Sequence, residues 1–297
     1  MSIQIPVSFV NQYRDNVYRL VQQNGSLLRN LVMEDSVKGE TAYYEQMGAV
    51  FAKEKAGRHV DTPQQDTPHS RRRLDLSTYN WSDLIDNDDH VRLLIDPTSK
   101  YVVNAADAMG RQTDTIIVDA MLGTSKAGHE GSELIELGDN QTIAHGDAGF
   151  TFDKLVEAKI KMDAANVPYN DRFLVITAAQ LGNLLKETKV TSSDYATVKA
   201  LVRGDIDTFM GFKFISCNGK RDEAGNPIIP LTTVGGNNIR SCFAFHRDAL
   251  QLGIGQNPVA RVTERADKCY ATQVYFEMSL GAVRMEEARV VKIECKE

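Results

Sequence analysis

Apolar and polar side chains alternate along the stretch from Tyr270 to Leu280. Successive side chains of an extended chain point to opposite faces, so a period of two residues is typical of a half-buried β-strand. The sequence therefore predicts antiparallel strands here and one more strand at Arg289–Cys295. One face carries Tyr270, Thr272, Val274, Phe276, Met278 and Leu280, the other carries Ala271, Gln273, Tyr275, Glu277 and Ser279, and such a strand is expected to be half-buried.

A helical period replaces this alternation between Pro97 and Leu122. Asp96 can cap the first turn, Pro97 suits the first helical position, and Gly123 follows the last apolar residue. We expect one long helix, which at the helical rise per residue would span about 39 Å. Its apolar face is formed by Val102, Ala105, Met109, Thr113, Ile116 and Ala120.

From Thr151 onward, helical and strand patterns follow one another. Thr177 and Gln180 match the Ser/Thr-x-x-Gln capping box that opens a helix. Helices and strands are segregated along the chain, so the expected fold class is α+β. The predicted helices lie at Phe152–Ala165, Thr177–Lys186 and Asp194–Val202, and the predicted strands lie at Phe173–Ile176, Phe209–Ser216 and Ser241–Phe245.

A long polar segment, Lys53–Arg73, interrupts the globular pattern between two candidate strands, Thr41–Lys55 and Leu74–Trp81. Ordering it would cost roughly 20–40 kcal/mol of backbone entropy, with almost no apolar burial to offset that cost. The two strands predict a long ribbon, and we expect another subunit to cover its irregular tip. The candidate intersubunit contacts on this arm are Arg58, Arg71, Arg72 and Arg73.

Composition and charge argue against two classes of protein, dedicated nucleic-acid binders and membrane proteins. The chain has 297 residues, 42% of them hydrophobic, and a formal net charge of −6. An acidic chain argues against a dedicated nucleic-acid binder, so any contact with DNA should be weak. The sequence contains neither a run of apolar residues long enough to span a membrane nor a signal peptide, so we expect it to be made in the cytosol and to have no membrane partner.

The sequence contains none of the common motifs of catalytic, nucleotide-binding or metal-binding sites. The sequence has no phosphate-binding glycine loop, no His-Glu-x-x-His pair and no Gly-x-Ser-x-Gly turn, and its four cysteines are widely spaced. The acidic turn Asp86–His90 lacks the spacing of a calcium loop. We therefore predict no catalytic residues, no cofactor and no metal, and a structural protein rather than an enzyme.

One stretch carries a family resemblance. Residues Ile176–Phe214 read ITAAQLGNLLKETKVTSSDYATVKALVRGDIDTFMGFKF, a strand–helix–helix pattern followed by Gly-Asp-Ile-Asp-x-Phe-x-Gly-Phe. With the ribbon and the long helix, it resembles the tailed-bacteriophage major capsid proteins of the Hong Kong 97-type (HK97-like) fold. The resemblance implies an N-terminal arm (1–40), an extended loop with connector (41–95), a peripheral domain with a spine helix (96–150), an axial domain (151–257) and C-terminal strands returning to these sheets (258–297).

The resemblance also implies a function. The chain would form hexamers and pentamers of an icosahedral head around double-stranded DNA, assembled in the host bacterial cytoplasm. Its partners would be other copies of itself, a separate scaffolding protein, a portal and possible decoration proteins. An encapsulin-type nanocompartment shell is the alternative within the same fold. An oligomeric enzyme that uses Gly123–Gly149 as a flexible lid is the alternative from another class.

Gly110 lies inside the expected helix, where alanine would be more stable by up to about 1 kcal/mol. Close packing against a neighbouring strand would explain the glycine. The resemblance adds a second interpretation, a site where the spine helix bends as the particle expands.

Overall fold

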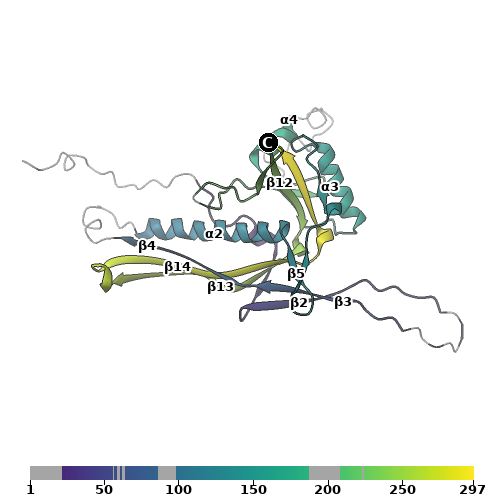
Figure 1. Cartoon of the computed structure of the whole chain (residues 1–297), viewed down its shortest axis with the longest axis horizontal. Coiled ribbons are helices and arrows are strands. Elements are labelled where there is room, and N and C mark those ends of the chain that lie inside the picture. Colours follow the sequence, from purple (N-terminus) through teal and green to yellow (C-terminus); the bar gives the residue numbers. More distant parts are fainter. Residues whose placement is uncertain are drawn as a thin grey trace, which may run out of the picture.

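The computed structural model describes residues 22–55, 57–58, 61, 64–85, 98–186, 208–222 and 224–297. These residues form a compact unit, a long helix lying along a long hairpin, and a ribbon that projects from the opposite end (Figure 1). The expected cap at Asp96-Pro97, the expected helix Asp194–Val202 and the first 21 residues of the N-terminal arm lie outside the described residues.

A four-stranded sheet with the order β1-β13-β14-β4 forms the long part of the molecule. Its strands are β1 (Met33–Ser36), β13 (Leu250–Arg265), β14 (Ala271–Arg284) and β4 (Ser77–Ile85). Helix α2 (Thr98–Leu122) lies along this sheet and ends at the predicted residue (Figure 1). The two elements bury a shared core of Ala105, Met109, Val274, Phe276, Met278 and Leu280. The predicted alternation is thus confirmed from Val274 to Leu280, but it does not hold at the start, where Tyr270 is exposed and Ala271 is buried.

A seven-stranded sheet forms the compact unit, with the order β7-β15-β12-β8-β10-β9 and β11 paired to β12. Its core includes Phe150, Leu155, Leu174, Phe212 and Ile293. Its elements are β7 (Thr142–Ile143), α3 (Phe152–Ala164), β8 (Arg172–Ile176), α4 (Ala178–Lys186), β9 (Thr208–Phe209), β10 (Phe212–Ser216), β11 (Leu231–Val234), β12 (Asn237–His246) and β15 (Val290–Lys296).

The helices of this unit begin where the sequence predicts. Thr151 Oγ1 accepts a hydrogen bond from Lys154 N at 3.4 Å, which caps α3. Thr177 Oγ1 accepts one from Gln180 N at 3.5 Å at the start of α4. Both caps satisfy a backbone donor that the first turn of a helix leaves free.

A third sheet, with the order β2-β3-β5-β6, forms the base of the ribbon. It contains β2 (Thr41–Met47), β3 (His69–Asp75), β5 (Ser125–Ala127) and β6 (Glu133–Ile135). The predicted return strand Leu74–Trp81 is extended as expected, but it is divided between the end of β3, which begins earlier at His69, and the start of β4 at Ser77. The predicted first strand Thr41–Lys55 is too long, since β2 ends at Met47. The inward face of β3 carries Arg72 and Leu74, and both side chains are buried. Because arginine is a polar residue type, the sequence pattern gave no sign that position 72 faces the interior.

The chain crosses twice between the long sheet and the seven-stranded sheet. The first crossing is the 3₁₀ turn Arg247–Ala249 between β12 and β13, and the second is the turn Glu287–Arg289 between β14 and β15. Met285 N donates to Ala249 O at 2.8 Å, so the two crossings lie side by side. Short 3₁₀ turns also occur at Arg29–Leu31, Asp139–Gln141 and Ala266–Lys268.

An acid-sensitive contact joins α3 to β8. Arg172, which is buried, donates to Asp163 Oδ1 at 2.6 Å, and Lys159 Nζ donates to Asp163 Oδ2 at 2.9 Å. The hydrogen bonds from Lys159 and Arg172 hold the pKa of Asp163 below its ordinary value. The stabilisation from this carboxylate is therefore present above the ordinary aspartate pKa and is lost as the pH falls through the lowered pKa.

We expect Asp163→Asn to lower the free energy of unfolding at neutral pH and to have a smaller effect at acid pH. Urea unfolding of disassembled subunits at both pH values measures this difference. Glu157→Gln on the same helix is the matched control, because Glu157 is half-exposed and lies 3.7 Å from its partner Lys161, so that this pair should contribute little. An equal effect of Asp163→Asn at both pH values would contradict the assignment.

Candidate assembly interface

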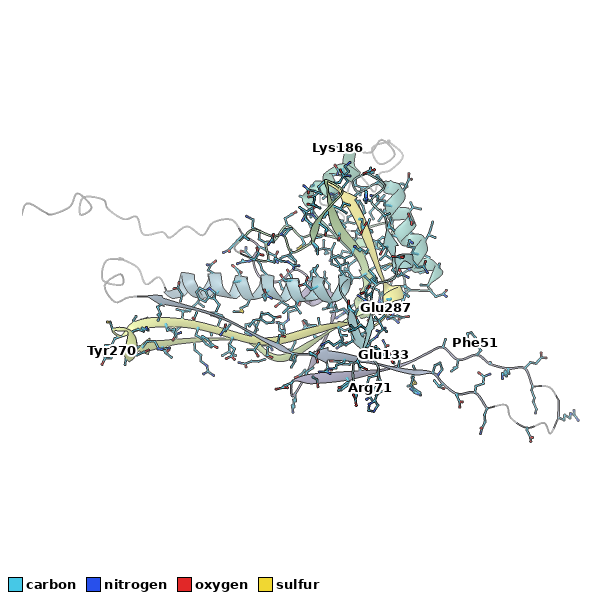
Figure 2. The ribbon with its side chains drawn as sticks, in the orientation of Figure 1. Phe51, Arg71, Glu133, Lys186, Tyr270 and Glu287 are labelled. Carbon is cyan, nitrogen blue, oxygen red and sulfur yellow. The ribbon has the colours of Figure 1, made fainter. Side chains whose placement is uncertain are left out.

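Among the residues that the structure describes, the two most exposed large apolar side chains, Phe51 and Met47, lie on the ribbon. Residues 48–55, which follow β2, are all exposed, with Val50 at 59% and Phe51 at 79% of their full accessibility. Figure 2 shows Phe51 far from both the compact unit and the tip of the β13–β14 hairpin at Tyr270. Single exposed apolar residues are common, but several on one projecting arm mark a surface for contact with another molecule.

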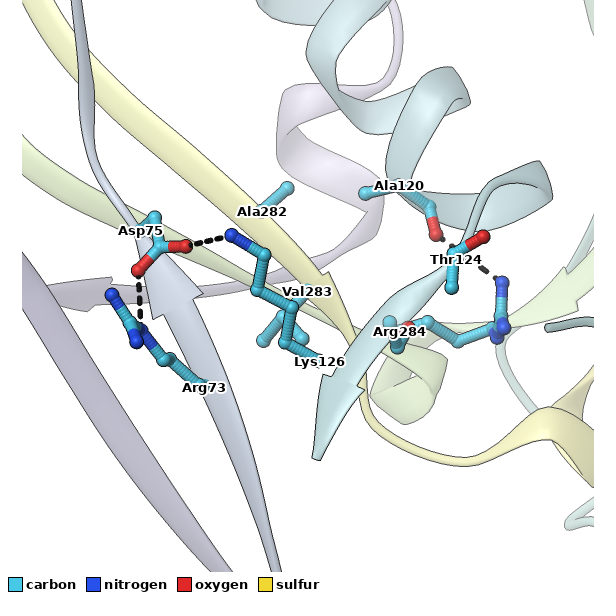
Figure 3. A pocket seen from close by; sticks show the side chains of 9 residues that line it. Arg73, Asp75, Ala120, Thr124, Lys126, Ala282, Val283 and Arg284 are labelled. Carbon is cyan, nitrogen blue, oxygen red and sulfur yellow. Dashed lines mark hydrogen bonds and ion pairs between the residues drawn. The ribbon is translucent and has the colours of Figure 1, made fainter. Parts of the chain in front are cut away.

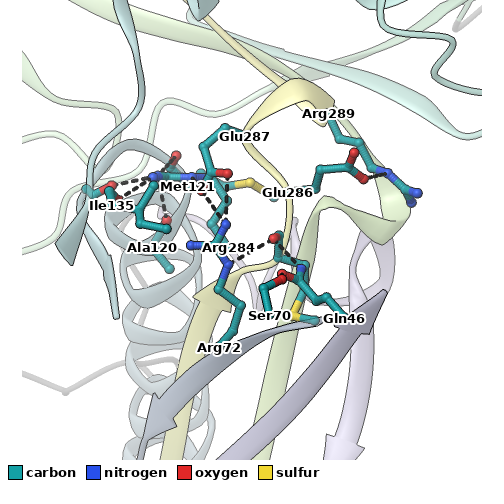
Figure 4. A network of polar contacts seen from close by, with 12 residues as sticks. Gln46, Ser70, Arg72, Ala120, Met121, Ile135, Arg284, Glu286, Glu287 and Arg289 are labelled. Carbon is teal, nitrogen blue, oxygen red and sulfur yellow. Dashed lines mark hydrogen bonds and ion pairs between the residues drawn. The ribbon is translucent and has the colours of Figure 1, made fainter. Parts of the chain in front are cut away.

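A buried ion network fixes the base of this ribbon (Figure 4). Arg72, on the inward face of β3, is only 6% exposed. Its Nη2 donates to both carboxylate oxygens of Glu287, at 2.8 and 3.0 Å, and its Nε donates to Met285 O at 3.1 Å. Gln46 Nε2 from β2 donates to the same carbonyl at 2.5 Å. Both ribbon strands are thereby fastened to the second crossing.

Arg284 extends the network to the end of α2. This side chain is fully buried, and its Nη1 donates to Met121 O at 2.9 Å and to Gly123 O at 2.6 Å. A cation here satisfies carbonyls that the last turn of a helix leaves free. Burial lowers the pKa of Arg284, and the nearby Glu287 carboxylate, 3.5 Å from Nε, opposes that shift. Glu287 thus serves two buried arginines, one from the ribbon and one beside the long helix.

A second network holds β3 against β5 on the outer side (Figure 3). Asp75 accepts from Arg73 Nε at 2.7 Å and from Lys126 Nζ at 2.6 Å. Arg73 Nη1 also donates to Glu130 O at 3.0 Å. Arg73, Asp75 and Lys126 border a small polar cavity of about 130 Å³ together with Arg284. The ribbon base is therefore anchored on two sides.

The sequence of this chain matches a known protein family. A family model described as phage capsid protein matches residues 5–297. The chain belongs to the phage capsid protein family. A search of curated proteins finds no match.

Solved capsid structures share the fold. The capsid of cyanophage P-SCSP1u superposes with a TM-score of 0.72 at 15% identity, covering 97% of this chain and 93% of that chain. The capsid of Ralstonia phage GP4 has a TM-score of 0.74 at 9% identity, with coverage of 96% and 94%. The head structure of Helicobacter pylori bacteriophage KHP40 has a TM-score of 0.74 at 8% identity, with coverage of 99% and 98%.

These likenesses confirm the HK97-like α+β fold predicted from the sequence. In the terms of that fold, the β2–β3 ribbon is the extended loop and α2 is the spine helix. Capsid proteins are structural proteins, and the family therefore points to a non-enzymatic role. Within the described residues, no group of metal-ligating side chains gathers, and no helix has both the length and the apolar character needed to cross a membrane.

The arginines singled out from the sequence occupy different environments on the capsid fold. Arg72 is buried against its own chain, and Arg73 pairs with Asp75. Arg71 lies over the Tyr43 ring at 5.4 Å, and its Nε donates to Glu45 at 2.8 Å. The premise that this arm lacks partners in its own chain is therefore wrong for these three residues. Arg58 is exposed on the projecting part. A role between subunits remains a prediction for all four.

The sequence missed the partners of this site, namely Glu287, Arg284, Asp75 and Lys126. Arg72 and Glu287 are 215 residues apart in the chain. A single sequence carries no signal that would pair residues at such a separation.

Gly110 packs closely against another part of the same chain. A Cβ placed on it would lie 2.3 Å from the carbonyl carbon of Gly25 and 2.6 Å from Ser26 N. The neighbour is thus the N-terminal segment rather than the strand expected from the sequence. Whether the spine helix also bends here stays a prediction.

Proposed function

We propose that this chain is the major capsid protein of a tailed phage and assembles as hexamers and pentamers into an icosahedral head around double-stranded DNA. The observation that carries the proposal is the ribbon, anchored at its base by buried ions while its apolar side chains project into solvent. The base of the ribbon is thus held in a fixed direction, while its apolar side chains remain exposed in the isolated subunit. A neighbouring subunit would bury Val50 and Phe51 and give the assembly its interface energy.

The geometry of this contact favours closed rings. The ribbon of one copy would meet a different surface on the next copy, which is a heterologous contact, and repetition of a heterologous contact closes into a ring when the rotation permits. Hexamers and pentamers are rings of this kind. Assembly would take place in the host cytoplasm, with a separate scaffolding protein, a portal and possible decoration proteins as further partners.

The proposal is tested by expressing the full chain and imaging the particles by electron microscopy. Closed shells with sixfold and fivefold clusters are the expected result, and nuclease-protected DNA in particles from infected cells would establish the cargo. Particles that enclose a protein instead of DNA would favour the encapsulin-type alternative. Soluble monomers under all assembly conditions would overturn the proposal.

The lid-bearing enzyme receives no support from the segment Gly123–Gly149. This segment contributes β5 and β6 to the ribbon sheet and β7 to the seven-stranded sheet, so it is part of the framework. If this segment moved as a lid, the pairing of its strands in both sheets would be broken. A flexible lid would instead move without breaking a sheet.

We expect the shell to hold DNA by enclosure. With a net charge of −6, free subunits should bind duplex DNA with a Kd above about 1 µM at physiological salt, and the binding should weaken further as salt rises. A fluorescence titration with labelled duplex at several salt concentrations measures this. Tight binding that resists salt would contradict the expectation.

A further inference from the structure

The N-terminal segment Gln23–Leu28 is held on the spine helix by one buried carboxylate. Asp114, in the middle of α2, is fully buried. The backbone N–H groups of Leu27 and Leu28 each donate to it at 3.0 Å. The Ser26 hydroxyl and the Gln23 side-chain amide also donate to it. The carboxylate is thus shared among groups that lie 86–91 residues away in the chain.

The flanking residues of α2 extend this contact over about two helical turns. Asp107 Oδ1 accepts from Gly25 N at 2.9 Å, and Arg111 Nη1 donates to Gln22 Oε1 at 3.0 Å. Between them the bare face of Gly110 receives the Gly25 backbone, which has a φ of +62°. Any side chain on Gly110 would force the segment away from the helix.

The segment ends in the hydrophobic core. Leu28 is fully buried and belongs to a cluster that includes Val32, Ile117, Met121 and Cys217. If the contact with Asp114 opened, Leu28 would be drawn from this cluster and Cys217 would become accessible.

We propose that Asp114 is a latch that makes the N-terminal segment and the spine helix one mechanical unit, so that neither can move without the other. In the shell that we propose above, this latch would fix the direction from which the N-terminal arm reaches its neighbours. The latch itself is a property of the subunit. It can therefore be tested whether or not shells form.

The electrostatic surroundings agree with this role. Burial raises the pKa of Asp114, and the hydrogen bonds from Leu27, Ser26, Leu28 and Gln23 oppose that rise. A buried carboxylate is costly unless donors surround it, so the site is adapted to the segment that supplies them. Without the carboxylate, the backbone N–H of Leu28 would be left buried and unbonded, and that of the more exposed Leu27 would lose its partner.

The four native cysteines provide a direct reporter. Cys217 is buried in the same core cluster as Leu28, and burial raises its pKa to about 11, so its thiol should react slowly. Cys269 is exposed and should react at once. Cys242 and Cys295 are buried in the other core cluster and report on unfolding of the whole subunit.

The test is labelling of disassembled full-length subunits with a disulfide reagent, with mass spectrometry to assign each thiol. We expect Asp114→Ala to increase the labelling rate of Cys217 at least tenfold, with Cys242 and Cys295 still protected. Asp119→Ala is the matched control, since Asp119 lies on the same helix and pairs with the partly exposed Arg221. It should leave Cys217 as slow as in the wild-type chain.

Gly110→Ala provides a second route to the same result. The added methyl displaces Gly25 without touching the carboxylate, so Cys217 should again be labelled faster while Cys242 and Cys295 remain protected. Unchanged labelling of Cys217 in both variants would overturn the proposal. Simultaneous labelling of all three buried cysteines would overturn it as well, because it would show that the segment does not open separately from the fold.

Discussion

Replacing Glu287 with alanine should lower the free energy of unfolding of the subunit by about 3–5 kcal/mol, the usual cost of removing one partner from a buried ion pair. Both Arg72 and Arg284 would remain buried, and both would lose the carboxylate that they share. Since Arg72 belongs to β3 and Arg284 binds the last carbonyls of α2, the ribbon should also lose its fixed direction.

Urea unfolding of disassembled subunits measures this loss. Glu286→Ala is the matched control, because the neighbouring Glu286 pairs at 2.6 Å with a partly exposed arginine, Arg289. The control should change the stability by less than about 1 kcal/mol, as expected of an exposed pair. Equal effects of the two substitutions would show that the buried network does not stabilise the subunit.

The same network limits how a role between subunits can be tested. Inverting the charge of Arg72 would place two carboxylates together in a buried site and would damage the subunit itself. Arg58 and Arg71 are the informative positions, because they lie on exposed or half-exposed parts of the ribbon.

Replacing Phe51 with serine should raise the concentration needed for shell assembly by about 10- to 100-fold. Burying a phenylalanine side chain contributes about 1.5–3 kcal/mol, and each 1.4 kcal/mol changes an equilibrium constant tenfold. The side chain is 79% exposed in the isolated subunit, so its burial by a neighbour would contribute nearly all of this energy to assembly.

Light scattering across a concentration series measures the threshold, and circular dichroism checks that the subunit is intact. Ala52→Ser, on the same exposed stretch, is the matched control and should shift the threshold only slightly. If Phe51→Ser assembled at the wild-type concentration, the exposed stretch around Phe51 would not be part of the interface.

The sequence predicted the elements whose burial follows a simple period. Strand β14 and helix α2 each have one buried face, and their residues repeat accordingly. Strand β13 was not predicted, because its first residues are buried whereas nearly all positions from Asn257 to Glu264 are exposed. Its pairing with β14 also shifts register between Ile254 and Val259. Neither half of such a strand shows a clean alternation.

The candidate site was predictable only in part. The run Arg71–Arg73 stood out because three cations follow one another in a polar segment. Their partners could not be found, since contacts such as Arg72 with Glu287 arise from the way three sheets meet. The latch at Asp114 was hidden for the same reason. An aspartate in a helix resembles any other polar position until the segment that it binds is known.

The position of β15 within the seven-stranded sheet bears on how subunits are made. This strand, Val290–Lys296, lies between β7 and β12 and supplies buried Val290, Val291, Ile293 and Cys295. Along the chain these residues come after all the other strands that the structure describes. Without them, β12 has an open edge and the core beneath α3 is incomplete. A chain that stops before Val290 therefore lacks part of this core and cannot form the complete sheet.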